Sequence, residues 1–270
     1  MEKMKRAERL AVMGRILTAE PNRIFTLSYF CELFSAAKST ISEDAAMLAN
    51  IYKEMNLGCV ETLTGAAGGV RYRSIGVKGE DRAFMERVCE MLSSSSRVLP
   101  GGFLYFSDIL ADPELVSHMG NMIAGQYYDE HIDFVLTMET KGIPVALETA
   151  GALRVPLVIA RRATKVYEGS AVNISYVSGN GAIETMALSR RAVHEGQRTL
   201  IVDDFTRGGG TARGMIALMK EFGVPVAGVC FVLALERPKE DLMDNERSLM
   251  VMEPIGADNQ VHVRPSDWIK

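Results

Sequence analysis

The stretch LIVDDFTRGGGTARG, Leu200–Gly214, decides the fold of the larger part of this 270-residue chain. It opens with an apolar run that predicts a parallel strand buried on both faces and ending at Val202. Asp203 and Asp204 follow, and because ionised carboxylates are costly to bury, they favour a cleft where hydroxyls or a hydrated cation satisfy them. The glycines let the backbone pass close to a ligand, and the free N–H groups of a helix that opens near Thr211 attract an anion. Together these features predict a site for a sugar phosphate.

The order of these residues resembles the phosphoribosyl pyrophosphate (PRPP) signature of type I phosphoribosyltransferases. The resemblance implies that the acidic pair binds the ribose 2- and 3-hydroxyls and that Arg207 to Thr211 hold the 5-phosphate. A dinucleotide GxGxxG or a P-loop differs, because here the acids precede the glycines and no Lys-Ser/Thr pair follows them. The alternative is a turn with glycines for geometry alone, which leaves the acids without a purpose. The PRPP-binding residues expected from this stretch are Asp203, Asp204, Phe205, Thr206, Arg207, Gly208, Gly209, Gly210 and Thr211.

Around this stretch, helical and strand-like segments alternate from about Gly79 onward. Such an alternation predicts a doubly wound, mostly parallel sheet, whose ligands bind beyond the carboxyl ends of the strands. Strands are expected at 134–138, 156–160, 200–202 and 226–235, and helices near 81–92 and 113–130 and after Ile143, Ala182 and Thr211.

Two further loops are expected at those strand ends. Thr140, Lys141 and Gly142 follow the strand at 134–138 and match the position of the pyrophosphate-binding loop in phosphoribosyltransferases. The segment from Arg161 to Tyr176 resembles the flexible hood of that family, although a solvated basic loop is the alternative. The further PRPP-binding residues expected from these loops and from the LPGG loop are Thr140, Lys141, Gly142, Arg161, Arg162, Lys165 and Phe103.

The N-terminal part carries a different pattern, of helices followed by a hairpin. Apolar residues from Leu10 to Leu17 predict one helix, which ends at Glu20-Pro21-Asn22, and 27–34 a second. A third starts at Lys38, with Ala45, Leu48, Ile51 and Met55 as its inward stripe. Cys59–Arg73 then predicts two short strands around a glycine-rich tip. This order is typical of a winged helix-turn-helix, with a three-helix dimerisation domain as the alternative.

Charge supports nucleic-acid binding by this part alone. Residues 1–75 carry ten Lys and Arg against eight Asp and Glu, although the whole chain has a net charge of −4. The start of the third helix is expected in the major groove and the wing on the backbone or the minor groove. The expected DNA-binding residues are Lys38, Ser39, Thr40, Ser42, Arg71, Arg73, Lys3, Lys5 and Arg6.

Composition excludes several other classes. No apolar run approaches the roughly 20 residues that span a bilayer, and the first residues lack the apolar core of a signal peptide, so a cytoplasmic protein is expected. The four cysteines show no CxxC spacing and no nearby His, which argues against a zinc site and for reduced thiols. They are Cys31, Cys59, Cys89 and Cys230.

A winged helix joined to this α/β domain, with AKSTISED, TGAAGGVRY, LPGG, TKGIP and VDDFTRGGGT in that order, resembles the purine operon repressor family of Gram-positive bacteria, PurR. The resemblance implies a DNA-binding domain over 1–75 and a phosphoribosyltransferase-like effector domain over 76–270, kept as a PRPP sensor rather than as an enzyme. It further implies a homodimer that binds double-stranded DNA upstream of purine-synthesis genes and loses affinity when PRPP binds.

Three expectations about ligands and activity accompany this interpretation. PRPP is expected to bind with Mg²⁺, and guanosine tetraphosphate to compete with it, with Phe103 or Phe205 stacking on guanine. An active purine phosphoribosyltransferase with a DNA-binding appendage is the first alternative. A direct activator, which keeps its DNA contact when PRPP binds, is the second.

Overall fold

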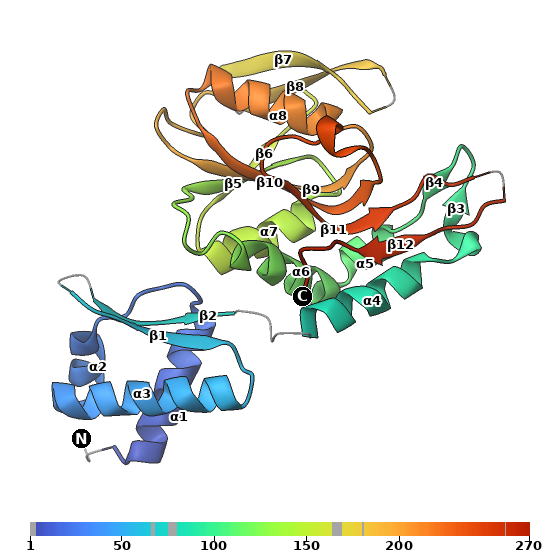
Figure 1. Cartoon of the computed structure of the whole chain (residues 1–270). Coiled ribbons are helices and arrows are strands. Elements are labelled where there is room, and N and C mark those ends of the chain that lie inside the picture. The colour runs from blue at the N-terminus through green and yellow to red at the C-terminus, as the bar shows by residue number, and fades with distance from the viewer. Residues whose placement is uncertain (1–3, 66–67, 75–79, 164–168, 180, 257) are drawn as a thin grey trace. The chain divides into compact units, whose positions relative to one another are not determined.

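The computed structural model describes residues 4–65, 68–74, 80–163, 169–179, 181–256 and 258–270. The chain folds as two compact units (Figure 1). The N-terminal unit comprises Met1–Val77 with Ala152–Arg154, and the C-terminal unit comprises Lys78–Gly151 with Val155–Lys270. The expected domain boundary between residues 75 and 76 falls outside the described residues. Each unit has its own cluster of buried hydrophobic residues, as independent domains do.

The N-terminal unit contains three helices and a hairpin in the order of a winged helix. Helices α1 (Arg6–Ala19), α2 (Leu27–Phe34) and α3 (Lys38–Glu54) precede the antiparallel strands β1 (Cys59–Leu63) and β2 (Gly69–Arg73). The helices and hairpin expected from the sequence are therefore confirmed, while residues 66–67 of the tip lie outside the described part.

Helix α3 turns a different face inward from the predicted one. Ala45 and Leu48 are buried as expected, but Ile51 and Met55 are 40% and 66% exposed. A charged residue, Asp44, is fully buried instead. The prediction was wrong because α1 and α2 supply buried partners to the earlier turns of α3 and leave its last turn in solvent.

A six-stranded sheet organises the C-terminal unit, in the order β12-β11-β10-β9-β5-β6. Only β12, at one edge of these six strands, is antiparallel to its neighbour, so the mostly parallel sheet is confirmed. The bounds are β5 (Phe134–Met138), β6 (Leu157–Ala160), β9 (Thr199–Thr206), β10 (Val226–Leu235), β11 (Glu246–Met252) and β12 (Val263–Pro265).

Both faces of this sheet are covered (Figure 1). On one face lie α8 (Gly210–Glu221) and the antiparallel hairpin of β7 (Ala171–Val177) and β8 (Ile183–Ser189). The other face carries α4 (Glu80–Leu92), α5 (Ser107–Ala111), α6 (Pro113–Gly125) and α7 (Ile143–Leu153). A short hairpin of β3 (Val98–Leu99) and β4 (Phe103–Leu104) precedes α5.

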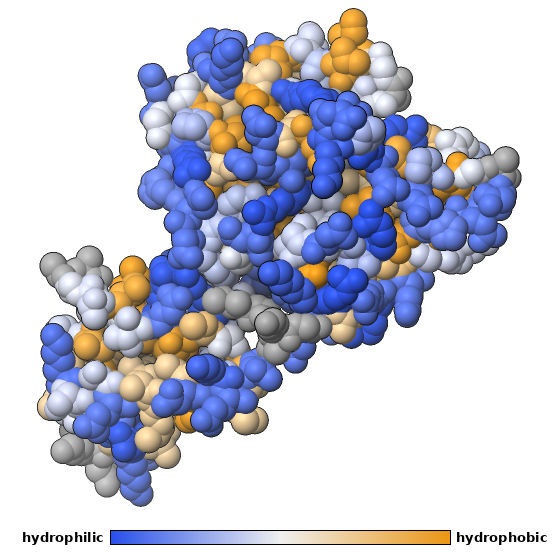
Figure 2. Space-filling model, viewed as in Figure 1, coloured by the Kyte–Doolittle hydropathy of each residue, from blue (hydrophilic) through white to orange (hydrophobic). Residues whose placement is uncertain are grey.

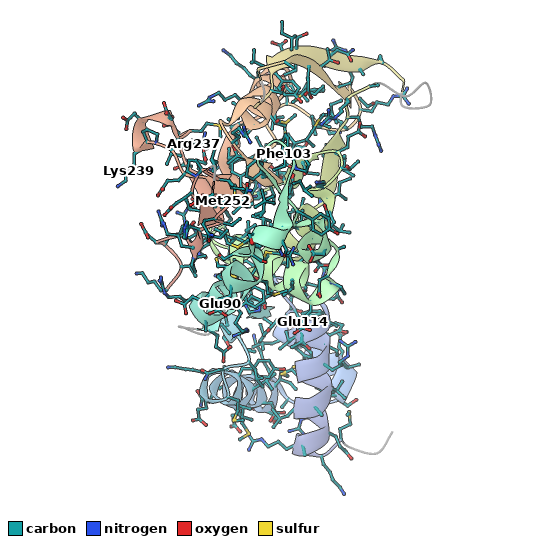
Figure 3. All side chains as sticks on the ribbon, turned by 90° about the vertical axis from the view of Figure 1, so that its right-hand side faces the viewer. Glu90, Phe103, Glu114, Arg237, Lys239 and Met252 are labelled. Carbon is teal, nitrogen blue, oxygen red and sulfur yellow. The ribbon has the colours of Figure 1, made fainter. Side chains whose placement is uncertain are left out.

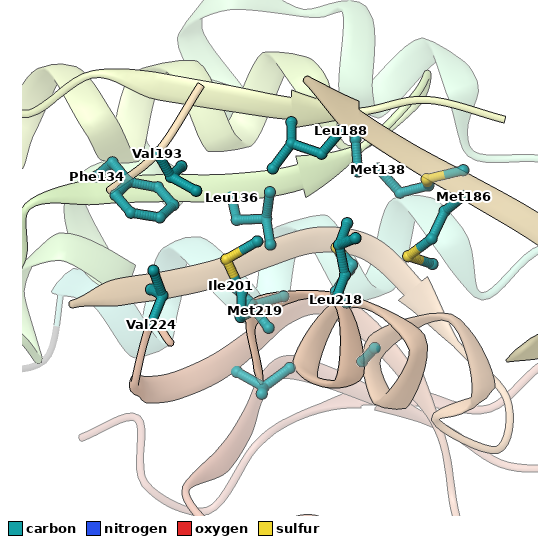
Figure 4. Close-up of a cluster of buried hydrophobic side chains, with 14 of the residues drawn as sticks. Phe134, Leu136, Met138, Met186, Leu188, Val193, Ile201, Leu218, Met219 and Val224 are labelled. Atoms are coloured by element: carbon teal, nitrogen blue, oxygen red, sulfur yellow. The ribbon is translucent and has the colours of Figure 1, made fainter. Parts of the chain in front are cut away.

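One cluster of buried apolar side chains in the C-terminal unit lies between the sheet and α8 (Figure 4). Leu136 from β5 and Ile201 from β9 pack with Leu218 and Met219 of α8. Met186 of the β7–β8 hairpin closes this cluster, so the hairpin is anchored to the core at its base. The continuous apolar pattern of β5 and β9 is thus explained by burial on both faces of the sheet.

Three expectations about elements of the C-terminal unit were wrong. The helix expected after Ala182 is strand β8, because pairing with β7 overrides the local preference of this segment. Helix α6 ends at Gly125 rather than near Glu130, since Tyr127 folds back and packs against Gly228. Strands β11 and β12 extend the sheet in the tail after Glu236, where no element was expected.

Hydrophilic side chains cover most of the surface seen in Figure 2, with apolar residues in scattered groups. Across the described residues, no helix combines the length and apolar character that crossing a bilayer requires. All four cysteines are free thiols, as expected.

Candidate functional site

The carboxyl ends of β5 and β9 meet at one edge of the sheet, because these strands are parallel neighbours. The loop after β5 and the end of β9 enclose a cavity of about 430 Å³ there. We call it the acidic cavity because Asp203 and Asp204 line it. Its lining residues are Met138, Glu139, Thr140, Lys141, Arg162, Asp203, Asp204, Phe205 and Thr211. Seven of these nine were expected from the sequence.

Strand β9 does not stop at the acidic pair, as the sequence pattern suggested, but continues to Thr206. The reason is β10, which is ten residues long and pairs with β9 as far as Ala234. Asp203 therefore belongs to the buried sheet and is only 5% exposed. The loop after β5 approaches it so closely that a Cβ on Gly142 would lie 2.1 Å from Asp203 Oδ1. Gly142 is thus required for close packing of the loop.

Burial changes the proton affinity of the acidic pair. Desolvation raises the pKa of Asp203 well above the usual value, and the neighbouring charge of Asp204 raises it further. Desolvation also raises the pKa of Asp204, while hydrogen bonds from Asp203 and from backbone N–H groups and the charge of Lys141 act in the opposite direction. The pair therefore favours a proton until a cation or hydroxyl donors enter the cavity.

Asp203→Asn is expected to raise the melting temperature of the ligand-free chain at pH 7.5 by at least roughly 2 °C. Because the folded pKa of Asp203 is raised, the unfolded chain releases this proton first, and stability is lost as pH rises above about 4. The neutral amide of Asn removes that loss of stability. The increase in melting temperature over the wild type should therefore become smaller as the pH is lowered toward 4. Thermal unfolding across this pH range, with the exposed Asp258→Asn as control, measures it. A lower melting temperature at pH 7.5 would contradict the expectation.

The loop between β9 and α8 has the form of an anion site. Gly209 adopts a left-handed conformation, with φ of 76°, and its N–H donates to Thr206 Oγ at 3.0 Å. Helix α8 begins at Gly210, one residue before the expected start, with its free N–H groups at the cavity edge. Thr206 is buried, so it shapes the loop instead of facing a ligand as expected. We call residues 207–211 the phosphate loop.

A second cavity of about 270 Å³ adjoins the first and shares Lys141, Asp204 and Phe205 with it. We call it the apolar cavity. Phe103, which is 59% exposed, lies at it, and the Arg207 guanidinium stands 5.8 Å from the centre of the Phe103 ring. Figure 3 shows Phe103 and Met252, two of its lining residues. The full lining is Leu99, Gly102, Phe103, Leu104, Phe106, Lys141, Asp204, Phe205, Arg207, Leu233 and Met252.

Arg161 and Arg162, two basic residues of the expected hood, both form ion pairs. Arg161 pairs with Glu139 at 3.3 Å and lines neither cavity, so its expected contact with a diphosphate is not supported. Arg162 lines the acidic cavity and pairs with Glu184 at 3.1 Å. Lys165, also expected there, lies outside the described residues.

Some lining residues escaped the sequence interpretation. Glu139 stands at the start of the loop after β5 and was not expected among the ligand-binding residues; its carboxylate accepts the backbone N–H of Arg162 at 2.8 Å. Phe106, Leu233 and Met252 carry no local signal, because they reach the apolar cavity from segments far apart in the chain. Within the described residues, no group of three or more His, Cys, Asp or Glu could hold a metal ion.

The expected DNA-binding residues separate into two groups. Lys38, Ser39 and Ser42 are exposed on the first turns of α3, and Thr40 is half-buried. Lys5 is exposed, whereas the guanidinium of Arg6 pairs with Asp44 at 2.9 Å and with Glu43 at 3.2 Å. Lys3 lies outside the described residues.

On the wing, the expectation for Arg73 was wrong. Its side chain is 6% exposed and pairs with Glu61 at 3.2 Å, because both residues face the same side of the hairpin. Arg71 stands opposite Glu61 in the strand register and pairs with it at 2.8 Å. One carboxylate thus engages both wing arginines, and Arg73 supports the hairpin instead of reaching DNA.

Comparisons with known proteins agree with both units. Residues 5–74 match the family described as bacterial purine repressor, N-terminal, and residues 107–267 match the phosphoribosyl transferase domain. The purine biosynthesis transcriptional repressor PurR of Bacillus subtilis is 39% identical over 99% of this chain and 95% of that protein. The purine biosynthesis transcriptional activator PurR of Lactococcus lactis is 38% identical over 95% of each.

Two phosphoribosyltransferases are similar to part of this chain. A xanthine phosphoribosyltransferase of Geobacillus thermodenitrificans is 32% identical over 55% of this chain and 79% of that protein. The crystal structure of adenine phosphoribosyltransferase from Thermoanaerobacter pseudethanolicus has a TM-score of 0.53 at 22% identity, covering 63% of this chain and 99% of that one. The second likeness shows a shared fold.

Proposed function

Because this chain belongs to the PurR family of bacterial purine biosynthesis regulators, we propose that it represses purine-synthesis genes by binding their control regions. PRPP in the acidic cavity lowers its affinity for DNA. The chain then acts in the cytoplasm, where it meets both ligands. The observation that carries the proposal is the acidic cavity itself, which joins Asp203 and Asp204, Lys141 of the loop after β5, and Thr211 at the end of the phosphate loop.

The cavity fits PRPP group by group. Buried carboxylates suit vicinal ribose hydroxyls, which can donate to them, and the N-terminus of α8 suits the 5-phosphate. Lys141, which is exposed at the cavity, suits the diphosphate. Mg²⁺ usually binds through one or two carboxylates together with ligand phosphates, so two acids with a diphosphate beside them fit it. The magnesium ion would therefore arrive with PRPP.

Regulation follows from linkage between the two ligands. A ligand that binds one state of a protein more tightly shifts the population toward that state. If PRPP lowers the affinity for DNA, bound DNA must lower the affinity for PRPP by the same factor. A gel shift with the control region of a purine-synthesis gene, with and without PRPP at one salt concentration, tests this. We expect saturating PRPP and Mg²⁺ to release DNA, and an unchanged affinity would refute the proposal.

Lys38→Ala is expected to weaken DNA binding about five- to tenfold at any sequence and to reduce the slope of log K against log salt by about 1. The reason is the loss of one exposed cation at the start of α3. Lys53→Ala, in the last turn of the same helix, is the matched control, since it removes equal charge roughly 22 Å away. Fluorescence anisotropy at several salt concentrations measures both variants. Equal losses in the two variants would contradict the placement of DNA at the start of α3.

An active phosphoribosyltransferase is the other candidate, favoured by the likeness to xanthine phosphoribosyltransferase. Among the described residues that line the apolar cavity, the titratable ones are Lys141, Asp204 and Arg207. The proposal assigns these three to the diphosphate, the ribose hydroxyls and the 5-phosphate, which leaves no further titratable group in this lining to manage a proton on a purine base. Incubation with PRPP and each purine base should therefore release no pyrophosphate beyond the base-free control.

Guanosine tetraphosphate is proposed as a competing ligand. Phe103 and Phe205 both line the apolar cavity, where either ring can stack on guanine beside the acidic cavity. Phe103→Ala should lower the affinity for guanosine tetraphosphate several-fold and leave the affinity for PRPP unchanged, as measured by displacement titration. If millimolar guanosine tetraphosphate displaces no PRPP, the proposal of this competing ligand is refuted.

A homodimer is proposed because winged-helix repressors read paired half-sites. Analytical ultracentrifugation should give a mass near twice 29.6 kDa. The monomer mass at micromolar concentration would contradict it.

A further inference from the structure

Arg237 follows β10 and is almost fully buried, with a side chain that is 8% exposed. Its Nη2 atom donates to Oε1 of Glu246, a buried carboxylate on β11. Its Nε and Nη1 atoms have no hydrogen-bond partner among the described residues. An arginine has five N–H donors, and leaving buried donors unused is costly, so this arrangement requires a reason.

Arg237 is labelled in Figure 3, and its Nη1 atom lies close to Gly209 of the phosphate loop. A Cβ added to Gly209 would lie 3.1 Å from Nη1 of Arg237 and 3.1 Å from Nη1 of Arg213. Arg213, on α8, donates from Nη1 to the carbonyl of Gly208 and from Nη2 to the carbonyl of Asp241 at 3.0 Å. Two guanidinium groups therefore converge on the loop at Gly209, where the missing side chain makes room for them.

Charge is not balanced at this point. Glu246 is the carboxylate that pairs with Arg237, and the recorded acceptors of Arg213 are neutral carbonyl oxygens. Arg237 and Glu246 are both buried, so solvent screens this pair little, whereas the excess positive charge is that of the exposed Arg213. The loop thus carries an excess positive field in addition to its backbone N–H groups.

We propose that Arg213 and Arg237 form a cationic support for the phosphate loop that selects a dianionic phosphomonoester, such as the phosphate on C5 of a ribose ligand. The inference rests on the proposed PRPP site and assigns the residues that decide its 5-phosphate specificity. These arginines act as positioning residues, through the loop and through their field. Part of the phosphate affinity then comes from Arg213 of α8 and from Arg237, which follows β10. Neither is among the PRPP-binding residues expected from the sequence.

Three probes separate this role from the rest of the site. PRPP and ribose 5-phosphate both carry the phosphomonoester, whereas inorganic pyrophosphate carries only the diphosphate. Calorimetry on the full chain with Mg²⁺ should show that Arg237→Met lowers the affinity for PRPP and for ribose 5-phosphate about tenfold. The affinity for pyrophosphate should change less than twofold. Arg237→Lys, which keeps the charge, should lose at most about threefold. Arg264→Met is the control, because it removes an exposed arginine that pairs with Glu236, beside Arg237 in the chain.

Glu246→Gln supplies a test of opposite sign that structural damage cannot imitate. In the wild type, Glu246 accepts from Arg237 through Oε1 and from Met243 N–H through Oε2, the latter at 3.0 Å. The single amide oxygen of Gln can keep only one of these bonds, and the compensating negative charge is gone. Ribose 5-phosphate should therefore bind several-fold more tightly. The inference is overturned if both Arg237→Met and Glu246→Gln leave the affinity for ribose 5-phosphate unchanged. It is also overturned if the affinity for pyrophosphate falls equally. In either case the proposed PRPP site remains. A wild-type chain that binds neither PRPP nor ribose 5-phosphate overturns both.

Discussion

Asp204→Asn is expected to leave DNA bound at PRPP concentrations that release the wild-type protein, so that its target genes stay repressed. The carboxylate lies between both cavities, where it can accept ribose hydroxyls and meet Mg²⁺. Hydrogen bonds to a charged group contribute about 1.5–3 kcal/mol each, so losing this acceptor should weaken PRPP about tenfold to a hundredfold. DNA affinity without PRPP should not change, since α3 and the wing belong to the other unit.

The measurement is a DNA titration by anisotropy at one salt concentration, repeated over a range of PRPP. Asp258→Asn, an exposed residue that lines neither cavity, is the matched control and should respond as the wild type does. The variant is not expected to unfold, because a neutral amide removes the cost of burying a charged carboxylate, the same desolvation that raises the pKa of Asp204. Retained release by PRPP, or lost DNA binding without it, would contradict the assignment of the site.

Asp44→Ala should destabilise the N-terminal unit by about 3–5 kcal/mol and abolish specific DNA binding, while PRPP still binds. Asp44 is fully buried on α3 and pairs with Arg9 of α1 at 2.7 Å, whose side chain is 8% exposed. Among the described residues, removing the carboxylate leaves the carbonyl of Met4, at 2.8 Å, as the one remaining acceptor of this buried guanidinium. Such an unpaired buried charge is more costly than the original pair.

Urea unfolding followed by circular dichroism, with calorimetry of PRPP binding, measures both parts of this expectation. Glu43→Ala is the control: its side chain is 70% exposed and pairs with Arg6, so it should change stability by less than about 1 kcal/mol. The double variant Arg9→Met with Asp44→Leu should recover most of the loss, because a packed apolar pair replaces the charges. Normal DNA binding by Asp44→Ala would show that this ion pair does not position α3.

Local sequence patterns were enough to predict the phosphate loop, the order of the strands along the chain and the winged-helix elements. Strand β5, strand β10 and helix α2 have the predicted bounds, and α8 begins within one residue of its predicted start. These features depend on local causes: apolar periodicity, the conformational freedom of glycine at Gly209, and unpaired N–H groups at a helix start.

The tertiary structure alone decided which charges are buried and which are available. Asp44 and Arg73 look like surface residues in the chain, yet α1 buries the first and Glu61 engages the second. The apolar cavity and the approach of Arg237 to Gly209 join segments separated by tens of residues. Desolvation and ion pairing depend on neighbours in space, and no local pattern records those neighbours.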